Sequence, residues 1–373
     1  MVVRDGLHLT YCTNIHPATG WESVWESLAA HAPALKARLS PDAPFGVGLR
    51  LSGTESSTLL EGDRLARFRA WLDEQGLYVF TLNAFPHGAF HGRPVKADVH
   101  APDWRSPERV DYTLRMAEIL AALLPEGEPG TISTNPLSYG PWIEGDAGAW
   151  ERCTDNLVRV ADALARLRAE RGVHIALAIE PEADGALADC ADLVRWWPER
   201  LDREHVTACF DACHAAVAYE EPAEALDALT SAGIRVGKVQ LSAALRVPLN
   251  GRSARDELQR FADPIYLHQV TQRNRDGTLS TWPDLADALP ALARPQGDEW
   301  RVHFHVPIFL EGYGRLESTQ DHLRRTIELV RERGFSSQLE IETYTWDVLP
   351  ADLKAPSVES IAREYEWVLG VLG

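Results

Sequence analysis

Short apolar runs alternate with amphipathic helical segments along most of the chain, and this alternation restricts the possible folds more than any other feature. At several points a helical segment ends in a charged turn, a glycine follows, and an apolar run begins at once, as after Gly76, Gly172, Gly233 and Gly334. Glycine supplies the left-handed conformation that ends a helix, and the runs that follow are too short for buried helices. They predict strands of a parallel sheet that helices cover on the outside.

Nine segments fit such strands, one more than a closed barrel of eight requires. In chain order they are HLTYCTNIHP, FGVGLRLS, LYVFTLNAFPHG, GTISTNP, HIALAIEPE, VTACFDACH, VGKVQLSAAL, VHFHVPIF and QLEIETYTW. A doubly wound nucleotide-binding sheet would carry a glycine-rich phosphate turn after its first strand, and no such motif occurs there. We therefore predict an α/β fold, a (β/α)8 TIM barrel with residues 1–373 as one domain, and the missing phosphate turn disfavours a nicotinamide dehydrogenase.

The alternation breaks down between residues 245 and 300. Here DPIYLHQVTQRN, the turn RDG and TLSTWPDL have the pattern of a β-hairpin or an extended loop. Insertions into a barrel most often extend the loops that build its active site. We expect residues 245–300 to form an insertion within the barrel, a lid or a side wall of the site.

The charge of the chain restricts its partners. The formal net charge is −18, which repels phosphate backbones and anionic lipid surfaces, and no lysine- or arginine-rich run offsets this repulsion. We expect a small-molecule substrate and no nucleic acid. The start MVVRDGLHLTYC lacks an export signal, and no stretch approaches the roughly 20 apolar residues of a membrane span. The expected location is the cytoplasm, without membrane insertion, and nothing in the sequence indicates the oligomeric state.

Functional residues of a (β/α)-barrel come from the C-terminal ends of its strands. Three carboxylates, Glu180, Asp211 and Glu342, follow apolar runs and should converge at the barrel mouth. One such carboxylate can cap a helix or pair with an arginine, but three in a small site repel one another unless a cation compensates. We therefore expect a divalent metal ion: Mg²⁺ suits carboxylates alone, whereas Mn²⁺, Zn²⁺, Co²⁺ or Fe²⁺ also suits an imidazole. His303 and His305 alternate by two in VHFHV, which puts both on one face of a strand and indicates a metal site.

Four segments from residue 174 onwards are similar to a known superfamily. HIALAIEPE, VTACFDACH, VHFHVPIFLEGYGRL and FSSQLEIETY resemble the xylose-isomerase-like superfamily of sugar phosphate isomerases and epimerases, which includes the ketose 3-epimerases. The resemblance implies a metal ion held by Glu180, Asp211, His305 and Glu342. It also implies that His214, in the D-x-x-H motif, binds the substrate.

VGKVQLSAALRVP also resembles the seventh strand of these barrels, with Gln240 at the position of the metal-binding histidine and Arg246 at that of a substrate-binding arginine. The sequence leaves open whether this segment or VHFHVPIF is the seventh strand. If it is VGKVQLSAALRVP, the third ligand is Gln240 or a histidine of the insertion, such as His268.

The whole chain further resembles the bacterial EboE family of metabolite traffic proteins, through LTYCTNIHP, YLHQVTQR, RVHFHVPIF and LEIETYTWDVLP. The name of this family points to the movement of a precursor metabolite and does not state a reaction.

These observations favour a metal-dependent isomerase or epimerase of a small polyhydroxylated or 2-oxo metabolite. The metal ion would polarise the carbonyl group, and Glu180 and Glu342 would exchange the proton on the neighbouring carbon. The residues expected to contact the substrate are His16, Asn83, His87, His214, Gln240, Arg246, His268 and His303. One alternative is a barrel that binds a metabolite and passes it on unchanged, which the EboE resemblance favours. A metal-dependent hydrolase of phosphodiesters would need a basic groove, which the acidic composition disfavours.

Overall fold

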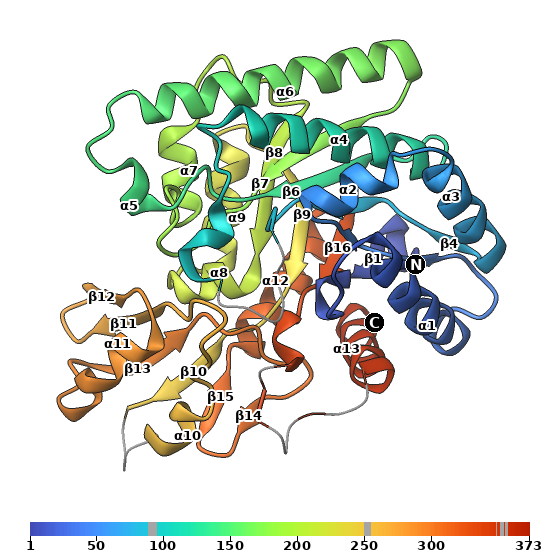
Figure 1. Ribbon diagram of the computed structural model, residues 1–373. Coiled ribbons are helices and arrows are strands. Elements are labelled where there is room, and N and C mark those ends of the chain that lie inside the picture. Colours follow the sequence, from blue (N-terminus) through green and yellow to red (C-terminus); the bar gives the residue numbers. More distant parts are fainter. Residues whose placement is uncertain (89–94, 250–254, 348, 351–353, 355–356) are drawn as a thin grey trace.

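The computed structural model describes residues 1–88, 95–249, 255–347, 349–350, 354 and 357–373. Its core is a sheet of eight parallel strands in the order β1-β16-β9-β8-β7-β6-β5-β3 (Figure 1). In chain order these strands are β1 (His8–Tyr11), β3 (Leu49–Arg50), β5 (Thr81–Asn83), β6 (Gly130–Thr134), β7 (Ile175–Ile179), β8 (Val206–Asp211), β9 (Val236–Leu241) and β16 (Gln338–Ile341). Cys12, directly after β1, forms a parallel bridge with Gly48, directly before β3, and so joins the two ends of the sheet. The predicted α/β barrel is confirmed.

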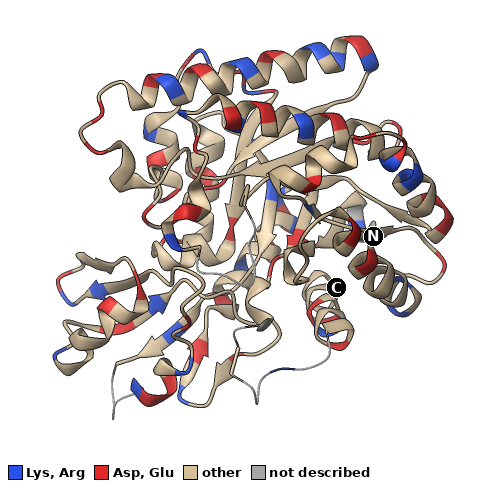
Figure 2. Ribbon diagram, in the orientation of Figure 1, with Lys and Arg blue, Asp and Glu red and all other residues tan. Residues whose placement is uncertain are grey.

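Helices cover the outside of the ring. They are α1 (Trp21–Leu39), α2 (Gly53–Leu59), α3 (Arg64–Gln75), α4 (Pro107–Leu123), α5 (Gly140–Ile143), α6 (Ala149–Arg171), α7 (Cys190–Trp196), α8 (Ala212–Val217), α9 (Pro222–Ser231), α12 (Gln320–Arg333) and α13 (Ser357–Leu372). Gly76, Gly172 and Gly334 end α3, α6 and α12 in the left-handed conformation, as predicted. Figure 2 shows acidic and basic positions interspersed along the outer helices α4 and α6, as solvated helix faces require.

Short elements complete the ring. The two-residue strands β2 (Phe45–Gly46) and β4 (Leu77–Tyr78) pair in parallel just before β3 and β5. Single turns of 3-10 helix are η1 (Arg4–Gly6), η2 (Thr13–Ile15), η3 (Lys96–His100), η4 (Leu289–Ala293) and η5 (Tyr344–Asp347). Residue 348, within the LEIETYTWDVLP motif, lies outside the described residues.

The seventh barrel strand is VGKVQL, because β9 pairs with β8 on one side and with β16 on the other. VHFHVPIF is not a barrel strand, and the prediction that His303 and His305 lie on one face of a strand is wrong. β13 ends at Val302, and residues 303–307 have no regular secondary structure. The backbone N–H of His303 still binds the carbonyl of Gln269 in the inserted region, but that of Val306 binds Ala243, just after β9. The segment therefore crosses from the insertion to the barrel mouth instead of continuing a strand.

Between β9 and β16 the chain forms a second sheet of six antiparallel strands in the order β12-β11-β13-β10-β15-β14, which lies beside the barrel at the lower left of Figure 1. The strands are β10 (Leu245–Pro248), β11 (Val270–Asn274), β12 (Leu279–Trp282), β13 (Gly297–Val302), β14 (Gly312–Tyr313) and β15 (Leu316–Ser318), with helices α10 (Arg255–Gln259) and α11 (Leu285–Ala288) between them. β11 and β12 form the predicted hairpin. Residues 250–254 of the expected insertion lie outside the described residues.

The interior of the ring is polar, whereas branched aliphatic side chains usually fill a TIM barrel. Lys238 Nζ lies 2.5 Å from Glu340 Oε2, and both side chains are fully buried. Burial by itself lowers the pKa of Lys238, but the Glu340 carboxylate and other neighbouring groups together outweigh burial and raise this pKa above its ordinary value. A Cβ atom on Gly48 would lie 1.7 Å from Glu340 Oε1, so the carboxylate occupies space that only a glycine leaves free. The core of the ring is thus built around a buried ion pair.

Glu364 of α13 connects two segments at the barrel mouth. Its Oε1 accepts hydrogen bonds from the Thr343 hydroxyl at 2.6 Å and from the backbone N–H of Ile308 at 3.3 Å. Burial raises the pKa of Glu364 to about 8, while these hydrogen bonds oppose the shift. The Glu364 carboxyl group therefore links Ile308, in the segment that follows His305, to Thr343, in the segment that follows β16.

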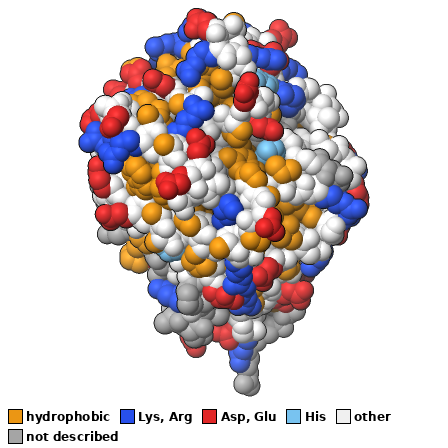
Figure 3. All heavy atoms as spheres, turned by 90° about the vertical axis from the view of Figure 1, so that its right-hand side faces the viewer, with side chains coloured by type: hydrophobic (Ala, Val, Ile, Leu, Met, Phe, Trp, Pro, Cys, Tyr) orange, Lys and Arg blue, Asp and Glu red, His pale blue; other side chains and the backbone are white. Residues whose placement is uncertain are grey.

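The surface carries charges of both signs. On the face at the right-hand side of Figure 1, acidic and basic side chains are interspersed among hydrophobic ones (Figure 3).

Within the described residues, no helix combines the length and the apolar character that a membrane crossing requires.

Replacement of Gly48 tests the packing around the buried ion pair. We expect Gly48→Ala to lower the free energy of unfolding by about 1 to 3 kcal/mol, the usual cost of overpacking, because the new methyl group displaces Glu340. Gly370→Ala is the control, since a Cβ at this position in α13 meets no atom within 4 Å. Chemical denaturation of both variants measures the effect, and equal stability of the two would contradict the packing that we describe.

The pH dependence of stability tests the Glu364 site. Its folded pKa of about 8 lies above the unfolded value of about 4.3, so its stabilising effect is present in full below the unfolded value and is lost as the pH rises through the folded value. Glutamine does not titrate. The stability of Glu364→Gln relative to the parent should therefore rise between about pH 5 and about pH 8, by at most about 1.4 kcal/mol per pH unit. Denaturation curves at several pH values measure this, with the exposed Glu359→Gln on the same helix as control; a constant difference would refute the assignment.

Candidate active site and metal centre

Three carboxylates meet at the C-terminal ends of the barrel strands. Glu180 directly follows β7, Asp211 is the last residue of β8, and Glu342 directly follows β16. One oxygen atom of each carboxylate lies within 4.8 Å of an oxygen atom of the other two. The three residues are 4 %, 3 % and 5 % exposed, respectively. The parallel direction of the strands explains this convergence, because it brings their C-terminal ends to one mouth of the ring.

Polar side chains orient two of these carboxylates. Asp211 Oδ1 accepts a hydrogen bond from the Ser242 hydroxyl at 2.8 Å. Glu342 Oε1 accepts hydrogen bonds from the side-chain amides of Asn14 at 2.8 Å and Asn83 at 2.9 Å. Asn14 follows β1, Asn83 is the last residue of β5, and Ser242 directly follows β9, so three separate parts of the barrel mouth position the acidic group.

The carboxylates disfavour one another's ionisation. Burial raises the pKa of Glu180 well above its ordinary value, and the charges of Glu342 and Asp211 add to the shift. The pKa of Glu342 is raised by burial first and then by Asp211, whereas Lys238 lowers both pKa values. In the described part of the chain, Glu180 Oε2 and Asp211 Oδ2 are buried without a hydrogen-bond partner. A divalent cation would relieve both the repulsion and the unsatisfied oxygens, so the residues present fit such an ion.

Three histidines lie beside the acidic group. His214 belongs to α8, and His303 and His305 belong to the segment that follows β13. The Nε2 atom of His303 lies 3.2 Å from the Nε2 atoms of both His214 and His305. Ligand atoms of Asp211, His214 and His305 form a second group within 4.8 Å of one another. Asp211 thus belongs both to the carboxylate group and to a group with imidazoles.

A pocket opens onto these groups from the barrel mouth. Its polar lining includes Glu180, Glu182, His214, His303, His305 and Glu342, together with Asn14 and Lys96. Its apolar wall includes Phe85, Pro86, Val95, Val99, Tyr266, Leu267 and Tyr344. Glu180 and Glu342 therefore face a pocket that has both a polar and an apolar side.

Several residues predicted to contact the substrate lie at or near this site. His214 and His303 line the pocket, and Asn83 holds Glu342. Gln240 in β9 is in register with Asp211 of β8 and is fully buried. Among the residues that the structure describes, neither polar atom of the Gln240 amide has a hydrogen-bond partner.

His16 and His87 lie beside the barrel mouth and make other contacts. His16 Nε2 lies 3.1 Å from the Tyr11 hydroxyl, and its ring stacks on His31. His87 packs edge-on against the ring of Tyr112. The side chains that line the described pocket do not include either histidine.

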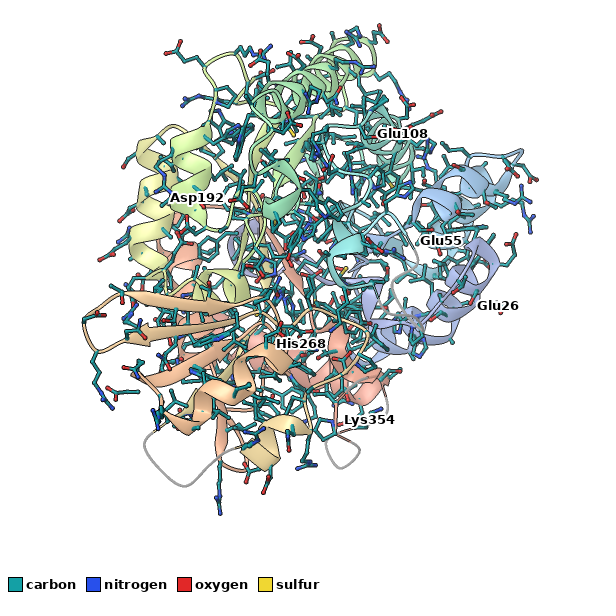
Figure 4. All side chains as sticks on the ribbon, turned by 60° about the vertical axis from the view of Figure 1, so that its left-hand side comes forward. Glu26, Glu55, Glu108, Asp192, His268 and Lys354 are labelled. Atoms are coloured by element: carbon teal, nitrogen blue, oxygen red, sulfur yellow. The ribbon has the colours of Figure 1, made fainter. Side chains whose placement is uncertain are left out.

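Arg246 and His268 belong to the inserted region. Arg246 in β10 donates a hydrogen bond to Asp321 at 2.6 Å and lines a groove together with residues of β15 and α12. His268, labelled in Figure 4, lies where the inserted sheet meets the barrel, with its ring stacked on Phe304 and one nitrogen bound to Asp263. Both nitrogens of His268 are engaged, because the other one binds the carbonyl of His303 at 2.8 Å.

Sequence reasoning missed two residues that shape the site. Lys238 stands in the middle of an apolar strand, and a charged residue at such a position was the signal that could have identified it. Gln269, whose Oε1 lies 2.7 Å from His303 Nδ1, carried no comparable signal, because the contact joins segments far apart in the sequence.

The chain is similar in fold to solved structures of sugar epimerases. An L-ribulose 3-epimerase matches with 11% sequence identity and a TM-score of 0.54, over 98% of this chain and 94% of the other. A D-tagatose 3-epimerase-like protein matches with 12% identity and a TM-score of 0.51, over 98% and 97% of the two chains. For a D-psicose 3-epimerase the identity is 14% and the TM-score 0.50, again over 98% and 97%. At these identities the similarity shows the fold alone.

Among curated proteins, none matches the chain. The sequence family described as xylose isomerase-like TIM barrel matches residues 46–291, which is well over half of the chain. The observed ring of strands agrees with that description, and the chain belongs to the xylose isomerase-like TIM-barrel family.

Proposed function

We propose that the protein is a metal-dependent isomerase or epimerase of a small polyhydroxylated or 2-oxo metabolite. One observation carries the proposal. The buried carboxylates of Glu180, Asp211 and Glu342 lie close together, and two of them, Glu180 and Glu342, line the pocket at the barrel mouth. Three buried carboxylates that repel one another cost stability, and such costly groups with strongly shifted pKa values are typical of functional sites. The fold of sugar 3-epimerases supports the same reading.

Glu180, Asp211 and Glu342 would hold a divalent metal ion, which would supply a Lewis acid for a substrate carbonyl. We place Gln240, and not His305, in the fourth position. β9 is the seventh strand, Gln240 is in register with Asp211, and its amide has no hydrogen-bond partner among the described residues. The ligand atom of His305, by contrast, is grouped with Asp211 and His214.

Glu180 and Glu342 have different surroundings, which suits them to opposite roles in proton transfer. Two amide N–H groups, from Asn14 and Asn83, stabilise the carboxylate form of Glu342. Glu180 Oε2 is buried and receives no hydrogen bond within the described chain. Glu342 would therefore take the proton from the carbon next to the carbonyl, and Glu180 would deliver one from its side of the substrate.

The pocket wall would protect this exchange from water. Tyr266 and Tyr344 pack edge-on with ring centroids 5.2 Å apart and close the pocket on one side. Lys96 donates hydrogen bonds to Asp284 at 2.6 Å and to the carbonyl of Tyr266 at 2.7 Å, which ties this wall to the insertion. The insertion would thus act as the side wall of the site.

The resemblance of the LTYCTNIHP and RVHFHVPIF motifs to the EboE family supports a second candidate, binding of a metabolite without conversion. We propose that the chain is a member of that family. Both motifs contribute to the site, through Asn14 and through the two histidines of VHFHV. The two candidates share the pocket and differ in whether a carbon-bound proton is exchanged.

Replacement of the carboxylates tests metal binding. Glu180→Gln and Glu342→Gln keep the shape of each side chain and remove a negative ligand, so both should bind Mn²⁺ more weakly than the parent protein. Isothermal titration of metal-free protein measures the loss, with the exposed Glu26→Gln on α1 as the control. Unchanged Mn²⁺ affinity in both variants would exclude the carboxylates as ligands.

Solvent exchange distinguishes catalysis from transport. A set of ketoses and 2-oxo acids incubated with the metal-loaded protein in deuterated water should include one that gains deuterium next to its carbonyl group. Glu342→Gln should reduce the exchange rate by about 100- to 10,000-fold, the usual contribution of a general base. Mass spectrometry measures the incorporation. A compound that binds tightly but gains no deuterium would instead support transport.

A further inference from the structure

The apolar wall of the pocket contains a hydrophobic cluster that is separate from the main core of the protein. Val95, Tyr266 and Tyr344 form this cluster, and Val99 and Ile265 pack against it. These residues come from three segments of the chain, which are the segment of η3, the insertion and η5. Apolar and aromatic side chains that gather along a pocket are typical of sites for small molecules.

Contacts within the protein hold this wall in place. The backbone N–H groups of Val95 and Lys96 both donate to the carbonyl of Ile265, at 2.9 and 3.3 Å. The Lys96 ammonium group donates to the carbonyl of Tyr266 and to Asp284. The one lysine that lines the described pocket is therefore bound to protein groups, and its charge joins the η3 segment to the insertion.

Two aromatic residues of the wall are tied to the surroundings of Glu342. Asn83 donates to Glu342 Oε1 at 2.9 Å, and its own Oδ1 accepts a hydrogen bond from the backbone N–H of Phe85 at 3.1 Å. Tyr344 comes two positions after Glu342, and its ring centroid lies 4.6 Å from that of His305. The apolar wall thus begins next to the carboxylate that we propose as the base.

A stack of rings supports Phe85. Its ring centroid lies 5.5 Å from that of His100, which in turn lies 5.6 Å from the ring of Tyr139. In the described part of the chain, neither ring nitrogen of His100 has a hydrogen-bond partner. Burial lowers the pKa of His100 to about 3, so the ring is neutral at physiological pH. His100 therefore packs as an uncharged ring, and this packing helps to fix the position of Phe85.

The wall suits an aromatic ring better than a row of hydroxyl groups. Apart from the hydroxyl groups of Tyr266 and Tyr344, the described side chains of the wall carry no polar atom. A hydroxyl group that is buried there loses its hydrogen bonds to water without replacement, and a sugar carries such a group on nearly every carbon. An aromatic ring instead gains from burial and from edge-on or offset contacts with other rings.

We propose that the substrate carries an aromatic ring, which the apolar wall binds while the carbonyl end of the substrate lies at the carboxylates. The inference rests on the proposed function and narrows its substrate class. It favours 2-oxo compounds or hydroxyketones with an aryl group over polyhydroxylated sugars.

Three hydroxyketones that differ only at their far end test the ring site. Hydroxybutanone has a plain chain, its phenyl derivative carries a phenyl group on the last carbon, and erythrulose carries hydroxyl groups on the last two carbons. In isothermal titration of the Mn²⁺-loaded parent protein, the phenyl derivative should bind about 10- to 100-fold more tightly than hydroxybutanone, the gain expected from burial of a phenyl group. A phenyl derivative that binds no more tightly than hydroxybutanone, or less tightly than erythrulose, would overturn the proposal.

Variants of the wall locate the ring. Leu267→Asn keeps the size of a half-buried wall residue but makes it polar, so the affinity for the phenyl derivative should fall about 10-fold while that for hydroxybutanone stays the same. Leu279→Asn is the matched control, because Leu279 in β12 is 47 % exposed, and it should change neither affinity. Phe85→Leu keeps the wall apolar but removes one ring, and it should also weaken binding of the phenyl derivative. Mn²⁺ affinity equal to that of the parent checks the folding of each variant. Full affinity for the phenyl derivative in both wall variants would refute the ring site.

Failure of the ring site and failure of the proposed reaction give different results. If the phenyl derivative binds most tightly but gains no deuterium next to its carbonyl group in deuterated water, the reaction is wrong and the ring site stands. If hydroxybutanone gains deuterium and the phenyl group adds no affinity, the ring site is wrong and the reaction stands.

Discussion

The concentration of negative charge at one end of a closed, buried ring is the constraint on which the rest of the structure depends. Glu180, Asp211 and Glu342 meet there, and Glu340 adds a fourth carboxylate below them. Lys238 is a cation of the barrel itself, and its Nζ is paired with Glu340. Burying an ion pair rarely stabilises a protein by itself, so the pair is better understood as a support for the acidic group above it.

This charge arrangement explains departures from ordinary barrel packing. Small and polar side chains replace aliphatic ones inside the ring, and Gly48 leaves room for the Glu340 carboxylate at the point where the ring closes. The amides of Asn14, after the first barrel strand (β1), and of Asn83, at the end of the third barrel strand (β5), hold Glu342. Residues from several strands of the ring therefore build the site. Gly48, which takes part in closing the ring, also leaves the space that the Glu340 carboxylate occupies.

Much of this could be predicted from the sequence, for physical reasons. The helix and strand alternation depends on local patterns, and carboxylates that end apolar runs must reach one mouth of a parallel barrel. The seventh strand could not be assigned, because VHFHVPIF alternates polar and apolar residues as a strand does while its backbone leaves the inserted sheet. The places of His16 and Arg246 depend on tertiary partners, Tyr11 and Asp321, that no local pattern reveals.

The order in which the chain is synthesised has a consequence for the site. β1 pairs with β16, and Glu364 of α13 ties down both the segment after β16 and the segment that carries the histidines. Nearly the whole chain must therefore be synthesised before Glu180, Asp211 and Glu342 can come together. Until β16 is in place, a growing chain lacks Glu342 at the barrel mouth, and the group of three carboxylates is incomplete.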